Sequence, residues 1–165
     1  RGVPPAEVCR AAARVFVSSR SSASALDVDL DLAVREDSEN PVYYVQYAHA
    51  RICSLVSRLA EEGDGVPDAS AVDPAVFATE EEKSLIKTLS QLPEVIRLSA
   101  RDYDPSHVNR YLITLAGEFH RFYNSCRIKG EEEKVLFARL KLADTVRSVI
   151  ANCLALLGVS APEKM

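Results

Sequence analysis

The chain has 165 residues, of which 47% are apolar, and it carries a formal net charge of −4. This length and composition allow one compact domain with a buried core, and the negative charge argues against a protein that coats nucleic acid without selectivity. No apolar run is long enough to span a bilayer, and the first residues lack a signal-peptide pattern. We therefore expect a cytoplasmic protein that does not contact membranes.

The charges are unevenly distributed along the chain. Residues 97–165 carry 11 basic and 8 acidic side chains, whereas residues 1–96 carry 9 and 16. A basic half on an acidic protein fits selective contact with a polyanion, and it also fits ordinary scatter of surface charge. The cysteines lie far apart without a Cys-x-x-Cys pair, which predicts buried, reduced thiols rather than a disulfide or zinc site. They are Cys9, Cys53, Cys126 and Cys153.

The first forty residues predict one helix and one extended segment. The chain starts at Arg1 without an initiator methionine, so we expect it to be part of a longer protein. Pro4 and Pro5 suit the first turn of a helix that runs to about Ser19. Residues 26–32 alternate apolar and acidic side chains, a period of two that predicts a short extended segment.

The next two helices have clear start signals. Asn40 and Pro41 form a cap and first turn for a helix that runs to about Glu62. Aromatic and amide side chains crowd residues 43–51, which indicates either a packed junction or a contact surface, and helical periodicity favours the junction. Residues 63–78 predict a surface loop. Thr79 and Glu82 then have the spacing of a capping box.

The second half predicts two long helices. Pro93 breaks the helix that begins near Thr79, and Asp104 caps a central helix whose first residue is Pro105 and whose end is marked by Gly130. One face of this helix is apolar and the other is polar. A last helix follows residues 131–133 and ends at Gly158. Five or six helices with short connections predict an all-α bundle.

The sequence offers little for catalysis. His49, His107 and His120 lie on separate segments, and no acidic residue is placed to complete a triad by sequence alone. We find no glycine-rich phosphate loop and no metal-ligand spacing. We therefore assign no catalytic, cofactor or metal site to this chain.

Several segments resemble bacterial arginyl-tRNA synthetases, in the same order along the chain. Residues 40–52, with the sequence NPVYYVQYAHARI, resemble the helix that leaves the catalytic domain of that family, and residues 26–33 resemble the end of the catalytic domain itself. The Leu-Pro-Glu-Val-Ile run at 92–96 is similar to the family's mid-domain helix break. Residues 111–127 resemble its central anticodon-domain helix, and residues 156–165 resemble its C-terminus. The match covers nearly the whole chain.

This resemblance implies a class I enzyme that uses ATP and Mg²⁺ to attach L-arginine to its tRNA during translation. The two ATP-binding signatures of the family, of the His-x-Gly-His and Lys-Met-Ser-Lys types, are absent from this chain, so we expect it to be inactive alone. The resemblance makes residues 1–39 the end of the catalytic domain and residues 40–165 the helical anticodon-binding domain. The implied partners are arginine-accepting tRNA and the missing catalytic domain, and we expect a monomer.

Eight residues are candidates for tRNA contact. Proteins read the unpaired bases of an anticodon loop by stacking aromatic rings on them and bonding their edges, and each stack contributes ~1–3 kcal/mol. The resemblance assigns such contacts to Tyr111 and Met165, although the stripe position of Tyr111 is equally that of a core residue. Charge and helix face suggest phosphate contacts for four more residues, and two others complete the set. These are Arg110, Arg121, Arg127 and Lys129, followed by His107 and Asn124.

The alternative to tRNA binding is a function of a different class. The chain would then be a helical bundle without catalytic function that binds a partner protein through residues 43–51.

Overall fold

The computed structural model describes residues 5–19, 31, 35, 37 and 39–165, and this part of the chain contains helices and no strand. The prediction of an all-α fold is therefore confirmed. None of the described helices combines the length and the hydropathy that crossing a membrane requires. The helices are α1 (Pro5–Ser18), α3 (Pro41–Glu61), α4 (Glu80–Ser90), α5 (Leu92–Asp102), α6 (Ser106–Ser125) and α7 (Glu133–Leu156), with 3-10 turns η1 (Ala69–Ala71) and η2 (Pro74–Val76).

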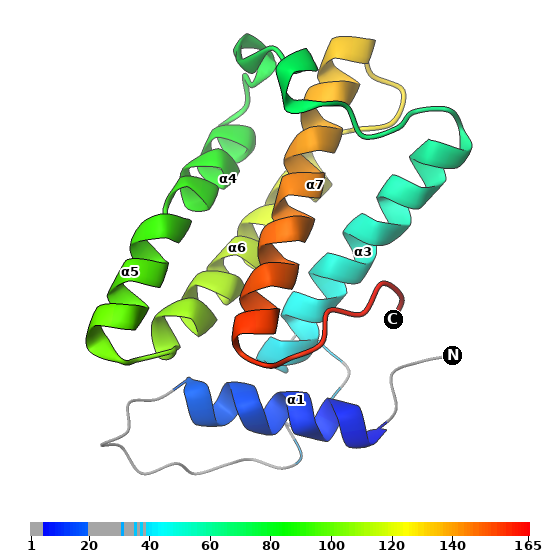
Figure 1. Cartoon of the computed structure of the whole chain (residues 1–165). Helices are drawn as coiled ribbons and strands as arrows, with labels where there is room; N and C mark the ends of the chain where they lie inside the picture. Colours follow the sequence, from blue (N-terminus) through cyan, green and yellow to red (C-terminus); the bar gives the residue numbers. More distant parts are fainter. Residues whose placement is uncertain (1–4, 20–30, 32–34, 36, 38) are drawn as a thin grey trace.

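The long helices stand side by side as a bundle, and α1 crosses beneath one end of it (Figure 1). Helix α6 packs against α3, α4, α5 and α7. The extended segment predicted for residues 26–32 lies outside the described residues, Asp31 excepted.

The predicted helix starts at Asn40 and Thr79 are confirmed. The side-chain oxygen of Asn40 accepts from Val42 N at 3.0 Å. Thr79 Oγ1 accepts from Glu82 N at 3.2 Å, while Glu82 Oε2 accepts from Thr79 N at 2.9 Å, so both halves of the capping box form. Leu92 begins a new helix immediately after α4, as the break at Pro93 predicts.

The bounds of the central helix differ from the prediction. Helix α6 begins at Ser106 rather than Pro105, although Asp104 Oδ1 still accepts from Ser106 N at 2.9 Å. The helix ends at Ser125, because Cys126 adopts an extended conformation with φ −107° and ψ 108°. Gly130 does not end the helix. It has a φ of 81° and belongs to the turn that leads into α7.

The predicted apolar face of α6 forms the centre of the core. Phe119 and Phe122 are both fully buried, and the thiols of Cys126 and Cys153 are buried beside them. Burial raises the pKa of the Cys153 thiol to about 11, which keeps it protonated and unreactive. The three cysteines whose side chains are described are free.

Helix α1 is held against the bundle by polar contacts. Arg14 Nη1 donates to Gly158 O at 2.7 Å, and Asn109 Nδ2 donates to Ser18 Oγ at 2.8 Å. Gly158 ends α7 with a φ of 67°, and a Cβ at this position would lie 1.9 Å from Arg14 Nη1. The positive φ therefore favours glycine here, and any other residue would also displace the end of the Arg14 side chain.

Candidate functional site

Three hollows follow one another along the surface between α3 and α6, with volumes of about 460, 310 and 420 Å³. The first two share Tyr47 and Arg51, and the last two share Arg58 and Tyr123, so they form one continuous surface. We call it the α3–α6 groove. Its aromatic and polar side chains, with one methionine, are Tyr43, Tyr44, Tyr47, Arg51, Ser54, Arg58, Glu62, His120, Tyr123, Asn124, Arg127, Lys129 and Met165.

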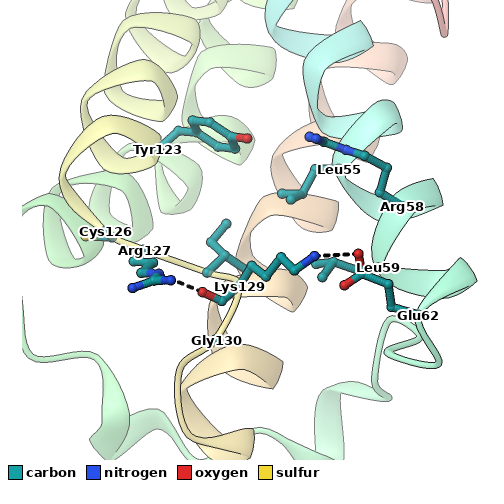
Figure 2. Close-up of a pocket in the computed structure, with 10 residues that line it drawn as sticks. Leu55, Arg58, Leu59, Glu62, Tyr123, Cys126, Arg127, Lys129 and Gly130 are labelled. Atoms are coloured by element: carbon teal, nitrogen blue, oxygen red, sulfur yellow. Dashed lines mark hydrogen bonds and ion pairs between the residues drawn. The ribbon is translucent and has the colours of Figure 1, made fainter.

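One end of the groove is a pocket between the last turns of α3 and the segment that follows α6 (Figure 2). Leu55, Leu59 and Ile128 give it an apolar lining, and Arg58 lies on the α3 side. On the other side, Arg127 Nε donates to Lys129 O at 2.9 Å. Lys129 Nζ donates to Glu62 Oε1 at 2.5 Å across the pocket, so an incoming anion must compete with Glu62 for Lys129.

The other end of the groove is built from stacked rings. The rings of Tyr43 and Tyr47 lie nearly parallel, with centroids 6.2 Å apart, and Tyr47 also stacks on His120 at 6.0 Å. Burial, and then the charge of Arg51, lower the pKa of His120. The imidazole is therefore neutral at pH 7, and the ring cluster carries no charge of its own. Tyr47 is 41% exposed and so offers ring surface to a ligand.

Guanidinium groups lie among these rings. Arg51 Cζ is 4.1 Å from the centroid of the Tyr123 ring, which fixes the arginine in place. Within the described part of the chain, no carboxylate forms an ion pair with Arg51, Arg58 or Arg127. Their positive charges are consequently available to an anionic ligand.

The structure places four of the eight candidate residues in the groove. Asn124 lies at the ring-rich end, Arg127 and Lys129 lie at the other end, and Met165 lines the hollow between them.

The structure places three further candidates elsewhere. Arg121 is exposed and pairs with Glu118, outside the three hollows. His107 and Arg110 lie at the start of α6, where Arg110 Nη2 and His107 Nδ1 are 3.0 Å apart. At 1.5 Å per residue, His107 and Arg110 lie about 25 and about 21 Å along the helix axis from Asn124.

Tyr111, the remaining candidate, presents almost no ring surface on which an RNA base could stack. Its side chain is only 5% exposed because it belongs to the apolar stripe of α6 that faces the core. Its hydroxyl has no hydrogen-bond partner among the described residues, and burial raises its pKa well above the ordinary value. Of the two explanations that the stripe position leaves open, the core residue is the one observed.

Sequence reasoning from charge and helix face missed the residues at the centre of the groove, namely Tyr47, Arg51, Arg58 and Tyr123. A signal was present in the crowded segment 43–51, where Tyr43, Tyr47 and Arg51 follow at steps of four residues and therefore share one side of α3. The periodicity favoured a packed junction. In the structure Tyr43 and Arg51 are partly buried and Tyr47 is exposed, and all three line the groove between α3 and α6.

A helical bundle whose groove combines ring faces with guanidinium groups is a binding domain suited to an anionic ligand that contains aromatic rings. The profile of the DALR anticodon binding domain matches residues 45–165. The chain belongs to this family.

Known proteins confirm the resemblance found in the sequence. The chain is 53% identical over 159 residues to the arginine–tRNA ligase of Acetivibrio thermocellus, and 49% identical over 159 residues to that of Ruminiclostridium cellulolyticum. Each alignment covers 96% of this chain and 28% of the relative. The structure of Thermus thermophilus arginyl-tRNA synthetase superimposes with a TM-score of 0.81 at 28% identity, over 96% of this chain and 27% of that one. The chain thus spans little more than a quarter of these relatives.

Proposed function

We propose that this chain is the anticodon-binding portion of an arginine–tRNA ligase, and that the α3–α6 groove takes the unpaired bases of the tRNA anticodon loop. The observation that carries the proposal is the overlap of the three hollows at Tyr47, Arg51, Arg58 and Tyr123. Ring faces lie there next to guanidinium groups that form no ion pair with a carboxylate of the described residues.

Single-stranded RNA has the chemistry that this groove fits. Its unstacked bases pack on aromatic rings, and its phosphates bind guanidinium groups. A groove with local positive charge also explains how a protein with a net charge of −4 attracts a polyanion, since the local field rather than the net charge acts on a bound loop. Asn124 adds an amide that can bond to a base edge.

The activity of the complete enzyme belongs to a part that this chain does not contain. In the proposal, residues 1–39 are the end of the catalytic domain and residues 40–165 are the anticodon-binding domain. The catalytic domain uses ATP and Mg²⁺ to activate L-arginine and transfers it to the tRNA. We place the enzyme in the cytoplasm as a monomer.

Replacing Tyr47 by alanine tests the proposed site. We expect the affinity for arginine-accepting tRNA to fall by at least about fivefold, because one base–aromatic stack contributes ~1–3 kcal/mol. Filter binding at several salt concentrations measures the effect. Tyr103→Ala is a matched control, since Tyr103 is 93% exposed and lies outside the groove; it should bind as the unchanged chain does.

Two further comparisons decide between the proposal and other functions. A tRNA whose anticodon is exchanged should bind more weakly than arginine-accepting tRNA if the groove reads anticodon bases. Equal binding of the two would show RNA binding without anticodon preference. Indifference to any RNA would reject the proposal and favour the helical bundle that binds a partner protein through residues 43–51.

Replacing Tyr111 by phenylalanine tests its assignment to the core. We expect the free energy of unfolding to rise by about 1–3 kcal/mol, because the change removes a buried hydroxyl that lacks a hydrogen-bond partner among the described residues. Urea unfolding measures this change. The affinity for tRNA should stay the same. A loss of affinity in a variant of unchanged stability would return Tyr111 to the binding site.

A further inference from the structure

Two buried polar side chains of α3 bind the segment that follows α7. Gln46 and His49 are only 5% and 3% exposed. Gln46 Nε2 donates to Ser160 O at 2.8 Å. His49 Nδ1 lies 2.9 Å from Pro162 O, and because a carbonyl oxygen only accepts, this nitrogen carries the hydrogen.

These bonds fix the path of residues 159–165. Gly158 turns the chain at the end of α7, Val159 N donates to Leu154 O at 2.9 Å, and the Val159 side chain enters the core. The segment then folds back toward α3 (Figure 1). Its last residue, Met165, reaches the hollow lined by Tyr47, Arg51 and Tyr123.

Residues 46–51 of α3 therefore contribute to the groove on one side of the helix and bind residues 159–165 on another side. Tyr47 and Arg51 line the groove. Gln46 and His49 alternate with them in sequence but are buried, and they bind the backbone of the returning segment. Residues as buried as Gln46 and His49 cannot touch a large ligand. Both sites of attachment are backbone carbonyls, so the contacts set the position of the segment whatever side chains residues 160 and 162 carry.

We infer that Gln46 and His49 are positioning residues that hold Met165 in the α3–α6 groove. Through Met165 they raise the affinity of the groove for RNA, a consequence that rests on the proposed function. A deletion or displacement of the segment would open the hollow between the aromatic and basic ends of the groove.

The placement of Met165 can be measured without RNA. Met165 is the only methionine in the sequence, so its ¹³C-labelled methyl group gives one NMR signal, which Met165→Leu assigns. Because Tyr47 and Tyr123 line the same hollow, ring currents should shift this signal. Gln46→Leu and His49→Leu should each move it toward the position of a free methionine and sharpen it.

Conservative and distant variants separate positioning from general destabilisation. His49→Asn keeps a donor near the place of Nδ1 and should restore the methyl signal that His49→Leu loses. Gln91→Leu and His107→Leu change the same residue types outside the groove, and both should leave the signal in place. An unmoved signal in Gln46→Leu and His49→Leu would overturn the inference.

A double-mutant cycle measures the effect on tRNA binding. We expect His49→Leu and Met165→Ala to weaken binding by about three- to tenfold each, and the double variant to bind no more weakly than either. Additive losses would show that His49 does not act through Met165. If Met165→Ala and Tyr47→Ala both leave tRNA binding unchanged while the methyl signal moves as expected, the proposed function fails and the positioning role stands.

Discussion

Replacing Glu82 by alanine is expected to lower the free energy of unfolding by about 3–5 kcal/mol, because the change breaks a buried ion pair and leaves Arg139 only a longer contact of 3.9 Å with Glu131 among the described carboxylates. The Glu82 side chain is fully buried and its Oε1 is 2.6 Å from Arg139 Nε, while the Arg139 side chain is 13% exposed. Glu82 Oε2 also accepts from Ala78 N and Thr79 N, each at 2.9 Å. Urea unfolding followed by circular dichroism measures the loss.

Burial alone would raise the pKa of Glu82, but hydrogen bonds from Arg139 and Thr79 hold the pKa below its usual value. The carboxylate is therefore charged at neutral pH and its contribution to stability is complete there. Between the lowered pKa of the folded state and the ordinary value near 4.5, the unfolded chain binds a proton that the folded chain does not. The free energy of unfolding should therefore decrease as the pH is lowered through this window, and it should decrease less in Glu82→Ala.

Glu80→Ala is the matched control for this prediction. Glu80 occupies the same first turn of α4, but its side chain is 88% exposed and its ion-pair partner among the described residues is Lys83. Exposed pairs of this kind contribute ~0–1 kcal/mol. An equal loss in both variants would show that charge near the helix start, rather than the buried pair, stabilises this region. Coupling between Glu82→Ala and Arg139→Met, measured as non-additive losses, would establish the pair directly.

Replacing Arg51 by alanine should produce the largest loss of tRNA affinity, about 100-fold. Two contributions combine, namely a charge for a phosphate and a guanidinium plane that packs against Tyr123 with Cζ 4.1 Å from the ring centroid. The slope of log affinity against log salt should also fall by ~0.7, the value for one phosphate contact on single-stranded nucleic acid. Filter binding over a salt series gives both quantities.

Two arginine variants separate these contributions. Arg51→Lys keeps the charge and loses the planar group, so it should retain the salt slope while binding more weakly than the unchanged chain. Arg121→Ala removes an exposed charge on α6 outside the groove and should change neither quantity. A loss in Arg121→Ala as large as that in Arg51→Ala would mean that RNA responds to overall charge and does not occupy the groove.

Local signals in the sequence predicted most of the fold. Asn40 and Thr79 cap their helices through atoms within three residues, so the information lies in the adjacent sequence. The apolar stripe of α6 likewise follows from a period that the sequence displays directly. The end of α6 was missed because Cys126 leaves the helix to place Ile128 in the core, and only tertiary packing shows this.

The site was predicted less well than the fold. Tyr111 and Tyr123 both fall on the apolar stripe, yet Tyr111 is buried while Tyr123 is partly exposed and lines the groove. A helical period gives the direction of a side chain but not the neighbouring helix that covers it. The bonds from Gln46 and His49 to the returning segment join residues more than a hundred positions apart, and no local pattern encodes them.

The groove is assembled from separate stretches of chain, since Tyr47 belongs to α3, Tyr123 to α6, and Met165 to the segment after α7. A change in the size of any one of these side chains alters the space left for the other two. Natural relatives should therefore show correlated substitutions at these positions, with a smaller residue in one stretch accompanied by a bulkier one in another. Selection would act on the trio as a unit, even though the three codons lie far apart in the reading frame.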